Sequence, residues 1–263
     1  MKNIFYLATI SILFSCGNNV EEIKDPTSGV VLIKYEYYTD DLGQKIKDGK
    51  YTEWNRDGSL KLDCEYTDGK KEGSEIYFAT KDSVIHNTYV AGERSGACLT
   101  IVDGVTIQEL NFLDGKLNGK QRFYYHNGKL KSEGSMVDYR AVNNWKYYSP
   151  EHDHITELNF NENGISKELI GKWSLQRKDG KEEFMLLDKS GAFEYHSPLF
   201  KYDRKAIKQL SGVVLFGSQL VLGTRGGNLT YDIRYLYGDT LSLIDKKGIE
   251  NLFVKDKRYL MMK

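Results

Sequence analysis

One phrase recurs at a fixed interval of 23 residues in the first half of the chain. It occupies residues 66–73, 89–96 and 112–119, and the three copies align without a gap. Two copies carry Asp-Gly in the middle and one carries Ala-Gly. Asp-Gly supplies the positive-φ residues of a tight antiparallel hairpin. A period of this length is typical of a repeat array, in which each unit buries apolar surface against its neighbours.

Glycines divide this part of the chain into short segments of similar length. Adjacent turns are mostly 11 to 13 residues apart, with aromatic or alternating strand sequences between them. Asn127-Gly128 is expected to form a two-residue type I′ turn, like Asp114-Gly115. The spacing predicts an antiparallel meander over residues 30–164, in which each repeat adds two strands to one long sheet. The predicted turn and repeat-closing glycines are Gly58, Gly69, Gly73, Gly92, Gly96, Gly104, Gly115, Gly119 and Gly128.

The N-terminus has the composition of an export signal. Residues 1–15 begin with a cationic start and continue with an apolar run that is too short to span a bilayer. Leu13-Phe14-Ser15-Cys16 resembles a bacterial lipobox, which implies cleavage before Cys16 and lipidation of that cysteine. An ordinary signal peptide is the alternative. Residues 16–29 are polar and lack periodicity, so we expect a tether that holds the folded part at the membrane.

The repeats resemble the MORN-repeat variant of bacterial exported proteins. The sequence motif of that family is Tyr-x-x-Gly-Lys-x-x-Gly, then an aromatic strand, then Asn-Gly-Lys-Leu-Lys-x-Glu. Residues 129–134 and 58–61 match the last part of this motif. The resemblance implies a fold and leaves the activity open. Asp138-Tyr139 stands where Asp-Gly is expected, which indicates that the array ends there.

Large side chains occupy equivalent strands of successive repeats. Stacked from repeat to repeat, they would bury the area that a single-layered sheet needs. The alternative is an exposed aromatic strip that binds glycan or peptide. Lys and Glu between them are expected on the solvated face. The large residues are Tyr51, Trp54, Ile76, Tyr77, Leu99, Ile101, Phe123, Tyr125, Trp145 and Tyr147.

The cysteines and histidines do not form a recognisable reactive set. Cys64 and Cys98 would lie three strands apart in a meander, roughly 14 Å, which is too far for a disulfide. No histidine is spaced to activate either thiol. The His-x-His segment at residues 151–154 could seat a metal if its alternate residues share a face. A polar hairpin tip is the simpler interpretation, so no metal site is predicted.

A second pattern begins after Gly164 and predicts a separate domain over residues 165–263. Seven or eight short strands in about 95 residues favour a closed or nearly closed antiparallel barrel. Residues 169–173 resemble the opening of the lipocalin-like domains of bacterial lipoproteins. The resemblance places Gly171 and Trp173 on the first strand, with Arg258 stacked on Trp173. Side chains are expected to fill the interior; a cavity for a small apolar ligand is the alternative.

These patterns predict an all-β protein: a MORN-like antiparallel meander followed by a small lipocalin-like barrel. Lys plus Arg (37) balances Asp plus Glu (37), so no net charge favours nucleic acid. No catalytic triad, carboxylate pair or nucleotide fingerprint occurs, so neither an enzyme nor a cofactor is predicted. We expect a lipid-anchored protein of the bacterial cell envelope, on the periplasmic or the cell-surface side of the outer membrane. Its repeats would bind or scaffold a protein or glycan; the alternative is a carrier of a small hydrophobic ligand.

Overall fold

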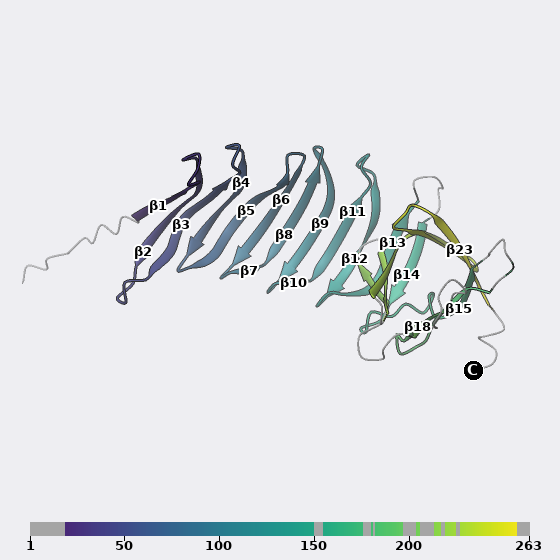
Figure 1. Cartoon of the computed structure of the whole chain (residues 1–263). Helices are drawn as coiled ribbons and strands as arrows, with labels where there is room; N and C mark the ends of the chain where they lie inside the picture. The colour runs from purple at the N-terminus through teal and green to yellow at the C-terminus, as the bar shows by residue number, and fades with distance from the viewer. Residues whose placement is uncertain are drawn as a thin grey trace, which may run out of the picture.

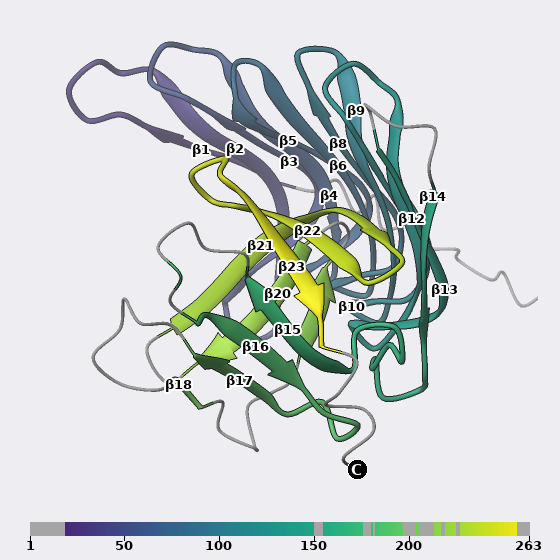
Figure 2. The ribbon, with the colours of Figure 1, turned by 90° about the vertical axis from the view of Figure 1, so that its right-hand side faces the viewer.

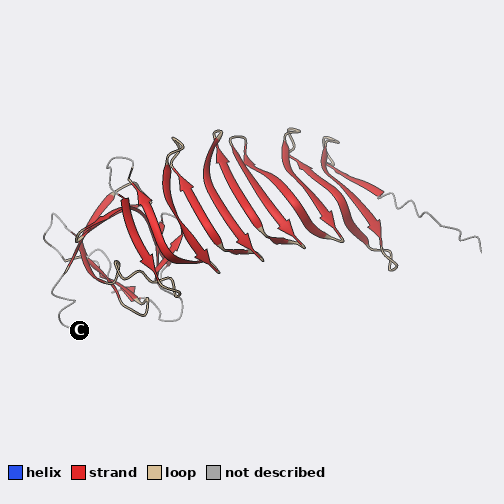
Figure 3. Ribbon diagram, turned by 180° about the vertical axis from the view of Figure 1, so that it is seen from behind, coloured by secondary structure: helices blue, strands red, loops and turns tan. Residues whose placement is uncertain are grey.

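All regular elements of the described residues are β-strands (Figure 3). The structure is a computed structural model, and it describes residues 19–149, 155–175, 180, 182–196, 204–205, 213–216, 219–224 and 227–256. Two antiparallel sheets follow one another along the chain (Figure 1). The predicted all-β fold, a long meander followed by a smaller curled sheet, is confirmed.

The first sheet contains fourteen strands of the described residues and follows the chain order. Twelve of them run from β1 to β14 across the sheet, and the short strands β7 and β10 pair with β6 and β9. Neighbours in sequence are thus neighbours in the sheet, as in a meander. The strands are β1 (Asn19–Lys24), β2 (Val31–Thr39), β3 (Lys45–Trp54), β4 (Leu60–Thr67), β5 (Lys70–Thr80), β6 (Ser83–Val90), β7 (Glu93–Arg94), β8 (Gly96–Val102), β9 (Val105–Leu113), β10 (Lys116–Leu117), β11 (Gly119–Tyr124), β12 (Leu130–Val137), β13 (Arg140–Tyr148) and β14 (Ile155–Phe160).

The first strand lies within the segment expected to be a tether. β1 pairs antiparallel with β2 and forms one edge of the sheet. The Glu21 carboxylate accepts hydrogen bonds from the Tyr35 hydroxyl and from Lys45 Nζ, both at 2.6 Å. The expectation of an irregular tether is therefore wrong for Asn19–Lys24. An open sheet edge offers unpaired backbone groups, so a polar segment can join it without an apolar alternation of its own.

Two-residue turns stack along one edge of the sheet and explain the 23-residue period. Both central residues have positive φ in the turns Asp68-Gly69, Ala91-Gly92, Asp114-Gly115 and Asp138-Tyr139. The second amide of each turn donates to a carbonyl of the preceding repeat: Gly69 to Lys47 (2.8 Å), Gly92 to Lys71 (2.9 Å), Gly115 to Arg94 (2.8 Å) and Tyr139 to Leu117 (3.1 Å). Each repeat is thus locked to the one before it through its turn. All nine glycines singled out in the sequence have positive φ.

The Asn127-Gly128 turn differs from the expected two-residue turn. Only Gly128 has positive φ there. The Tyr125 amide donates to the Lys129 carbonyl (2.8 Å), and the Gly128 amide donates to the Tyr125 carbonyl (2.9 Å). The loop therefore spans three residues. The strand pair that it joins carries a bulge between Phe123 and Tyr124, which shifts the register and accommodates the extra residue.

The array does not end at Asp138-Tyr139, contrary to the sequence-based expectation. β13 and β14 continue the sheet beyond this turn. Tyr139 (φ 66°) takes the conformation that glycine has in the earlier turns, and Asn143 (φ 59°) takes that of the repeat-closing glycines. The Tyr139 hydroxyl also donates to the Gly115 carbonyl at 2.5 Å, across to the previous turn. The backbone conformation of the repeat is therefore the same where Tyr139 and Asn143 replace its glycines.

The second sheet is a strongly curled half-barrel with nine strands of the described residues. Its order is β18-β17-β16-β15-β23-β22-β21-β20-β19, and in the described residues no ladder joins the end strands β18 and β19. The predicted barrel is thus open on one side. The strands are β15 (Gly171–Leu175), β16 (Phe184–Leu187), β17 (Phe193–His196), β18 (Arg204–Lys205), β19 (Val213–Phe216), β20 (Gln219–Thr224), β21 (Gly227–Tyr237), β22 (Thr240–Asp245) and β23 (Glu250–Lys255).

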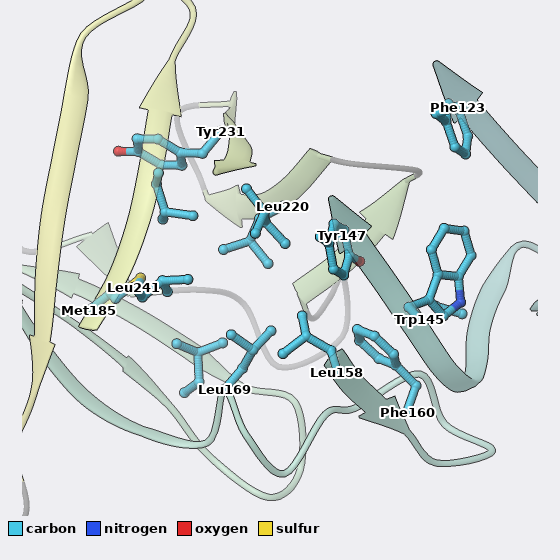
Figure 4. Close-up of a cluster of buried hydrophobic side chains, with 14 of the residues drawn as sticks. Phe123, Trp145, Tyr147, Leu158, Phe160, Leu169, Met185, Leu220, Tyr231 and Leu241 are labelled. Atoms are coloured by element: carbon cyan, nitrogen blue, oxygen red, sulfur yellow. The ribbon is translucent and has the colours of Figure 1, made fainter. Parts of the chain in front are cut away.

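The first sheet covers the inner face of the half-barrel (Figure 2). β13 and β14 pack against β19 and β21, and buried side chains of both sheets form one continuous cluster (Figure 4). Trp145 and Leu158 contribute from the repeats, and Leu220 and Leu241 from the half-barrel; all four are 0% exposed. The two sheets therefore share one core, which removes the need for the half-barrel to close on itself.

Candidate binding surface

The first sheet has a concave face and a convex face. Side chains alternate between the two faces along each strand, and the concave face is the one on which the half-barrel lies (Figure 2). We call the part formed by β11–β14, which packs against the half-barrel, the covered half. We call the part formed by β1–β9 the open half, because the described strands of the half-barrel lie only over the other end (Figures 1 and 3). The open half is therefore a surface that the described strands of the half-barrel leave uncovered.

Aromatic and cationic side chains alternate from strand to strand along the open half. The register places Tyr37 opposite Lys47, Tyr66 opposite Lys71 and Tyr89 opposite Arg94. All of these side chains lie on the concave face, on the side of the sheet where the two-residue turns stack. We call this set the cation–aromatic row: Tyr37, Lys47, Tyr66, Lys71, Tyr89, Arg94 and Phe112.

Each cation of this row lies over the aromatic ring of the next repeat. Lys47 Nζ is 4.9 Å from the ring centre of Tyr66, Lys71 Nζ is 5.1 Å from that of Tyr89, and Arg94 Cζ is 5.2 Å from that of Phe112. Lys47 is also 4.2 Å from the ring centre of Tyr51. Such contacts contribute about 0.5–1 kcal/mol each when partly exposed. The row is thus a built element of the surface, with both rings and cations held in place.

A buried carboxylate anchors the middle of the open half. Glu75 is 4% exposed; its side chain accepts a hydrogen bond from Asn87 Nδ2 at 2.8 Å and forms an ion pair with Lys71. Burial by itself would lower the pKa of Lys71, but the hydrogen bond and charge of Glu75 outweigh burial and raise it. A buried charge is tolerated when it is paired and hydrogen-bonded, so this group fixes the position of Lys71 in the row.

The floor of the open half is closed to water around Cys64. The Cys64 side chain is 4% exposed, and burial raises the pKa of its thiol to about 11. Burial and a hydrogen bond to Glu53 also raise the pKa of its neighbour Tyr51. Cys64 lies on β4 and Cys98 on β8, with β5 and β6 between them, and both are free thiols. The prediction that they do not form a disulfide is confirmed, and both act as small packing residues.

The aromatic residues singled out in the sequence are divided between the two faces. Tyr51, Phe123 and Tyr147 point to the concave face, whereas Trp54 and Ile76 point to the convex face. The bulge between Glu53 and Trp54 shifts the side-chain alternation by one residue, whereas the register shift between Asp63 and Glu65 spans two residues and keeps it. Residues at equivalent positions of the repeat therefore do not always point to the same face of the sheet, and these residues do not form a single strip.

The cations of the row are the residues that sequence reasoning missed. They were expected on the solvated face, yet Lys47 and Lys71 are half-buried against rings. A signal was present: Lys47, Lys71 and Arg94 each stand two residues before a glycine that has positive φ. Leu117 holds the same position in the next repeat and is buried. The change from cation to leucine marks the end of the open half.

A hollow of about 430 Å³ lies where the row ends. Phe112 and Leu117 line it on the apolar side, Arg94 on the charged side, and Tyr139 at the turn edge. It combines a cation, the neighbouring Glu93, aromatic rings and an aliphatic floor. Such a hollow suits a side chain of a partner that is itself apolar.

The half-barrel contains the signature residues expected on its first strand. Gly171 begins β15, and Trp173 is 0% exposed and donates from Nε1 to the Leu169 carbonyl at 2.8 Å. Lys255 Nζ lies 4.9 Å from the ring centre of Trp173. This is the place expected for Arg258, which lies outside the described residues. Burial lowers the pKa of Lys255.

The inner face of the half-barrel is packed by its own side chains in the described strands. Met185, Leu243 and Phe253 are each 0% exposed and belong to the shared core. Tyr195 donates to the buried Glu183 carboxylate at 2.5 Å, and burial raises the pKa of its phenol. A carried hydrophobic ligand stays a prediction.

Two further expectations concern ions and membranes. Cys16 and the His-x-His segment at residues 151–154 lie outside the described residues. No three His, Cys, Asp or Glu side chains that the structure describes are grouped to hold a metal ion. The part of the chain that it covers also contains no helix that could span a bilayer.

Over the described residues, these observations define an all-β protein with a fourteen-stranded antiparallel meander and a curled half-barrel sheet that share one core. No protein-family model matches the chain, and no curated protein is similar to it. The resemblances to MORN repeats and to lipocalin-like domains stay predictions.

Proposed function

We propose that this protein is a non-catalytic binding module of the bacterial cell envelope, and that the open half of its concave face binds a partner protein. The observation that carries the proposal is the cation–aromatic row, which continues unbroken over seven strands. Tyr and Arg are enriched at the energetic centres of protein interfaces because they combine large contact area with polar groups. Phe112 packs against the core that the half-barrel shares, and the other side chains of the row do not belong to that core in the described residues.

The size of the open half supports a protein as the partner. The row crosses six strand spacings from β2 to β9, about 29 Å at the usual separation of paired strands. A standard interface buries about 800 Å² on each partner, which a surface of this length can provide. The hollow beyond Arg94 adds a pocket for an anchoring side chain at one end.

Attachment through Cys16 would hold the array close to the membrane. Two residues separate Cys16 from β1, so lipid on Cys16 would hold this edge of the sheet roughly 10 Å from the membrane surface. The strands then follow one another away from the lipid, with the half-barrel at the far end. The location that we propose is the periplasmic or the cell-surface side of the outer membrane, as the lipobox resemblance implies.

Photo-crosslinking from single positions in the native cells tests this function. A benzoylphenylalanine at Tyr66 or Tyr89 of the concave face is expected to capture a discrete partner. The matched control is Tyr38, a half-buried tyrosine on the convex face of β2. Capture at the concave positions that is lost in Arg94→Gln supports the proposal. Equal capture at Tyr38, or no capture at either concave position, overturns it.

A further inference from the structure

The edge of the first sheet along which the two-residue turns stack exposes apolar side chains, and we call it the turn edge. Val90, Leu113 and Val137 each stand directly before such a turn, at the last position of β6, β9 and β12. Val90 and Leu113 are 53% exposed, and Val137 is 43% exposed. Leu42, in the loop between β2 and β3 at the same edge, is 82% exposed. We call these four residues the apolar row.

The opposite edge of the sheet differs in this respect. Its turns join β3 to β4, β5 to β6, β8 to β9 and β11 to β12, and they occupy residues 55–59, 81–82, 103–104 and 125–129. No large hydrophobic side chain of these four turns is exposed. Single exposed apolar residues are normal on a protein surface. Their recurrence at one repeat position along one edge is the feature that requires an explanation.

The strand residues of the apolar row lie on the convex face. Tyr89, Phe112 and Met136 directly precede them and point to the concave face, and successive side chains of a strand alternate between faces. The half-barrel lies on the concave side (Figure 2), so its described strands do not cover the row. A convex surface meets a flat surface along a line, and the apolar row runs along such a line.

The chain enters the first sheet at the turn edge. Asn19, the first residue of β1, pairs with Tyr37, two residues before β2 ends at Thr39. Only two residues separate Asn19 from Cys16, a reach of about 10 Å. The opposite edge is a strand length away, about 33 Å for the ten residues of β3. A lipid on Cys16 therefore brings the membrane to the turn edge and not to the opposite edge.

From these observations we infer that the apolar row is a membrane-contact edge, which rests on the lipid surface and holds the repeat array along it. The inference rests on the attachment through Cys16 that belongs to the proposed function, and it adds the orientation of the protein. The anchor has already removed most of the translational freedom of the chain, so a few half-exposed side chains are enough to fix this orientation. The open half of the concave face then stays accessible to a partner.

The charges beside the row do not select an anionic membrane. Lys116 and Arg140 are cross-strand neighbours of row residues, and so is Glu93. The adjoining turns carry Asp114 and Asp138, and Lys116 Nζ lies 3.4 Å from the Asp138 carboxylate. Acidic and basic groups are thus mixed along this edge. We therefore expect the aliphatic side chains to make the contact, without a requirement for anionic lipid.

Quenching of a fluorescent probe by labelled lipid tests the inference on the lipidated protein in phosphatidylcholine vesicles. Bimane is attached to Leu113→Cys, or to Lys81→Cys at the opposite edge as the control, while the buried Cys64 and Cys98 stay unlabelled. A doxyl group near the headgroup end of the acyl chain should quench the probe at residue 113 and leave the probe at residue 81 unchanged. Added phosphatidylglycerol should not increase the quenching. Equal quenching at both positions, or none at residue 113, overturns the inference.

Matched variants show whether the row makes the contact. With bimane at Val137→Cys, the double change Val90→Glu and Leu113→Glu should abolish quenching, because a carboxylate is costly to bring into an apolar region. Lys81→Glu changes the net charge by the same amount at the opposite edge and should leave the quenching intact. Full quenching in the double variant overturns the inference, as does a requirement for phosphatidylglycerol. If the crosslinked partner is still captured from Tyr66 in either case, the proposed function stands and only the membrane contact is wrong.

Discussion

The two halves of the concave face are built on the same repeat but differ in what fills them. In the covered half, Trp145 and Leu158 are 0% exposed and pack on the half-barrel (Figure 4). In the open half, Glu75 and Asn87 are also buried, and Asn87 Nδ2 donates to the Glu75 carboxylate, while Asn87 Oδ1 has no hydrogen-bond partner among the described residues. Strand pairing is continuous through both halves. The difference therefore lies in the side chains alone.

A single repeat position shows how this difference is encoded. Lys71 is paired with Tyr66 in the open half, and Leu117 is paired with Phe112 where the open half ends. The backbone at both places is the same stacked turn. A cation keeps a face hydrated and available, whereas an aliphatic side chain adds area that only a second layer can bury. The array thus changes from binding surface to core support by substitution within a constant framework.

The largest expected difference between the halves is in the cost of truncating an aromatic residue. Trp145→Ala should lower the free energy of unfolding by about 3–5 kcal/mol, since it opens a cavity in the shared core. Tyr66→Ala should cost only about 1 kcal/mol, because its ring is half-buried and lies between the Tyr51 ring and Lys47 at the surface. Urea unfolding followed by circular dichroism measures both. Equal destabilisation by the two variants would contradict the division into two halves.

The Trp145 site also offers a reverse test by overpacking. A Cβ added at Gly134 would lie 2.1 Å from Trp145 Cδ2. Gly134→Ala should therefore destabilise by about 1–3 kcal/mol, because the ring has to move within a packed core. The same urea titration measures the destabilisation. The matched change Gly104→Ala has open space around the new Cβ and tests only the positive φ of the turn. If Gly134→Ala were the milder of the two, Trp145 would not be tightly held.

Truncating the buried carboxylate tests whether the open half depends on its polar network. Glu75→Ala leaves Lys71 without its ion pair and the Asn87 amide without its acceptor. Removing a buried hydrogen-bond partner costs about 1–3 kcal/mol. The control is Glu65→Ala on β4, which is exposed and should change stability by less than about 0.5 kcal/mol. Similar small effects of both variants would mean that water replaces the carboxylate freely.

Much of this architecture follows from the sequence, because the turns carry it. Asp68-Gly69 and Asp114-Gly115 need two positive-φ residues, which few residue pairs supply. Their 23-residue spacing then fixes strand length and strand order. Tyr139 and Asn143 could not be recognised in the same way, since they reach the glycine conformation without being glycine. There the stacking of the turn on the preceding repeat holds the backbone.

The candidate surface was harder to predict from the sequence, because β-bulges help to decide which face of the sheet each side chain points to. The bulge between Glu53 and Trp54 shifts the register by one residue and so changes which face the side chains beyond it point to. The alternation of Tyr66, Lys71 and Tyr89 exists only once the strands are paired. Sequence periodicity gives the presence of aromatic and charged residues, while their juxtaposition is a property of the sheet.

The ionisation of Cys64 tests whether the floor of the open half is as dry as the covered half. Its thiol pKa is raised to about 11, against about 8.5 for a free thiol. The folded state therefore holds the proton more tightly than the unfolded state. Its contribution to stability is complete below pH 8.5 and is lost as pH rises towards 11, by on the order of 2 kcal/mol. The stability difference between wild type and Cys64→Ala, measured from pH 8 to 11, isolates this group. A constant difference would mean that water reaches the thiol.

The smallest effect concerns the turn that joins the two halves. Tyr139 has φ 66°, a conformation that costs a non-glycine residue about 1 kcal/mol, but its hydroxyl donates to the Gly115 carbonyl at 2.5 Å. Tyr139→Phe removes only the hydrogen bond, whereas Tyr139→Gly removes both the bond and the strain. The glycine variant should therefore be more stable than the phenylalanine variant by about 1 kcal/mol, a difference of roughly 2–4 °C in Tm. Thermal unfolding of the pair measures it. If the phenylalanine variant is the more stable, packing of the ring against the preceding turn stabilises this turn by more than the strained backbone of residue 139 costs.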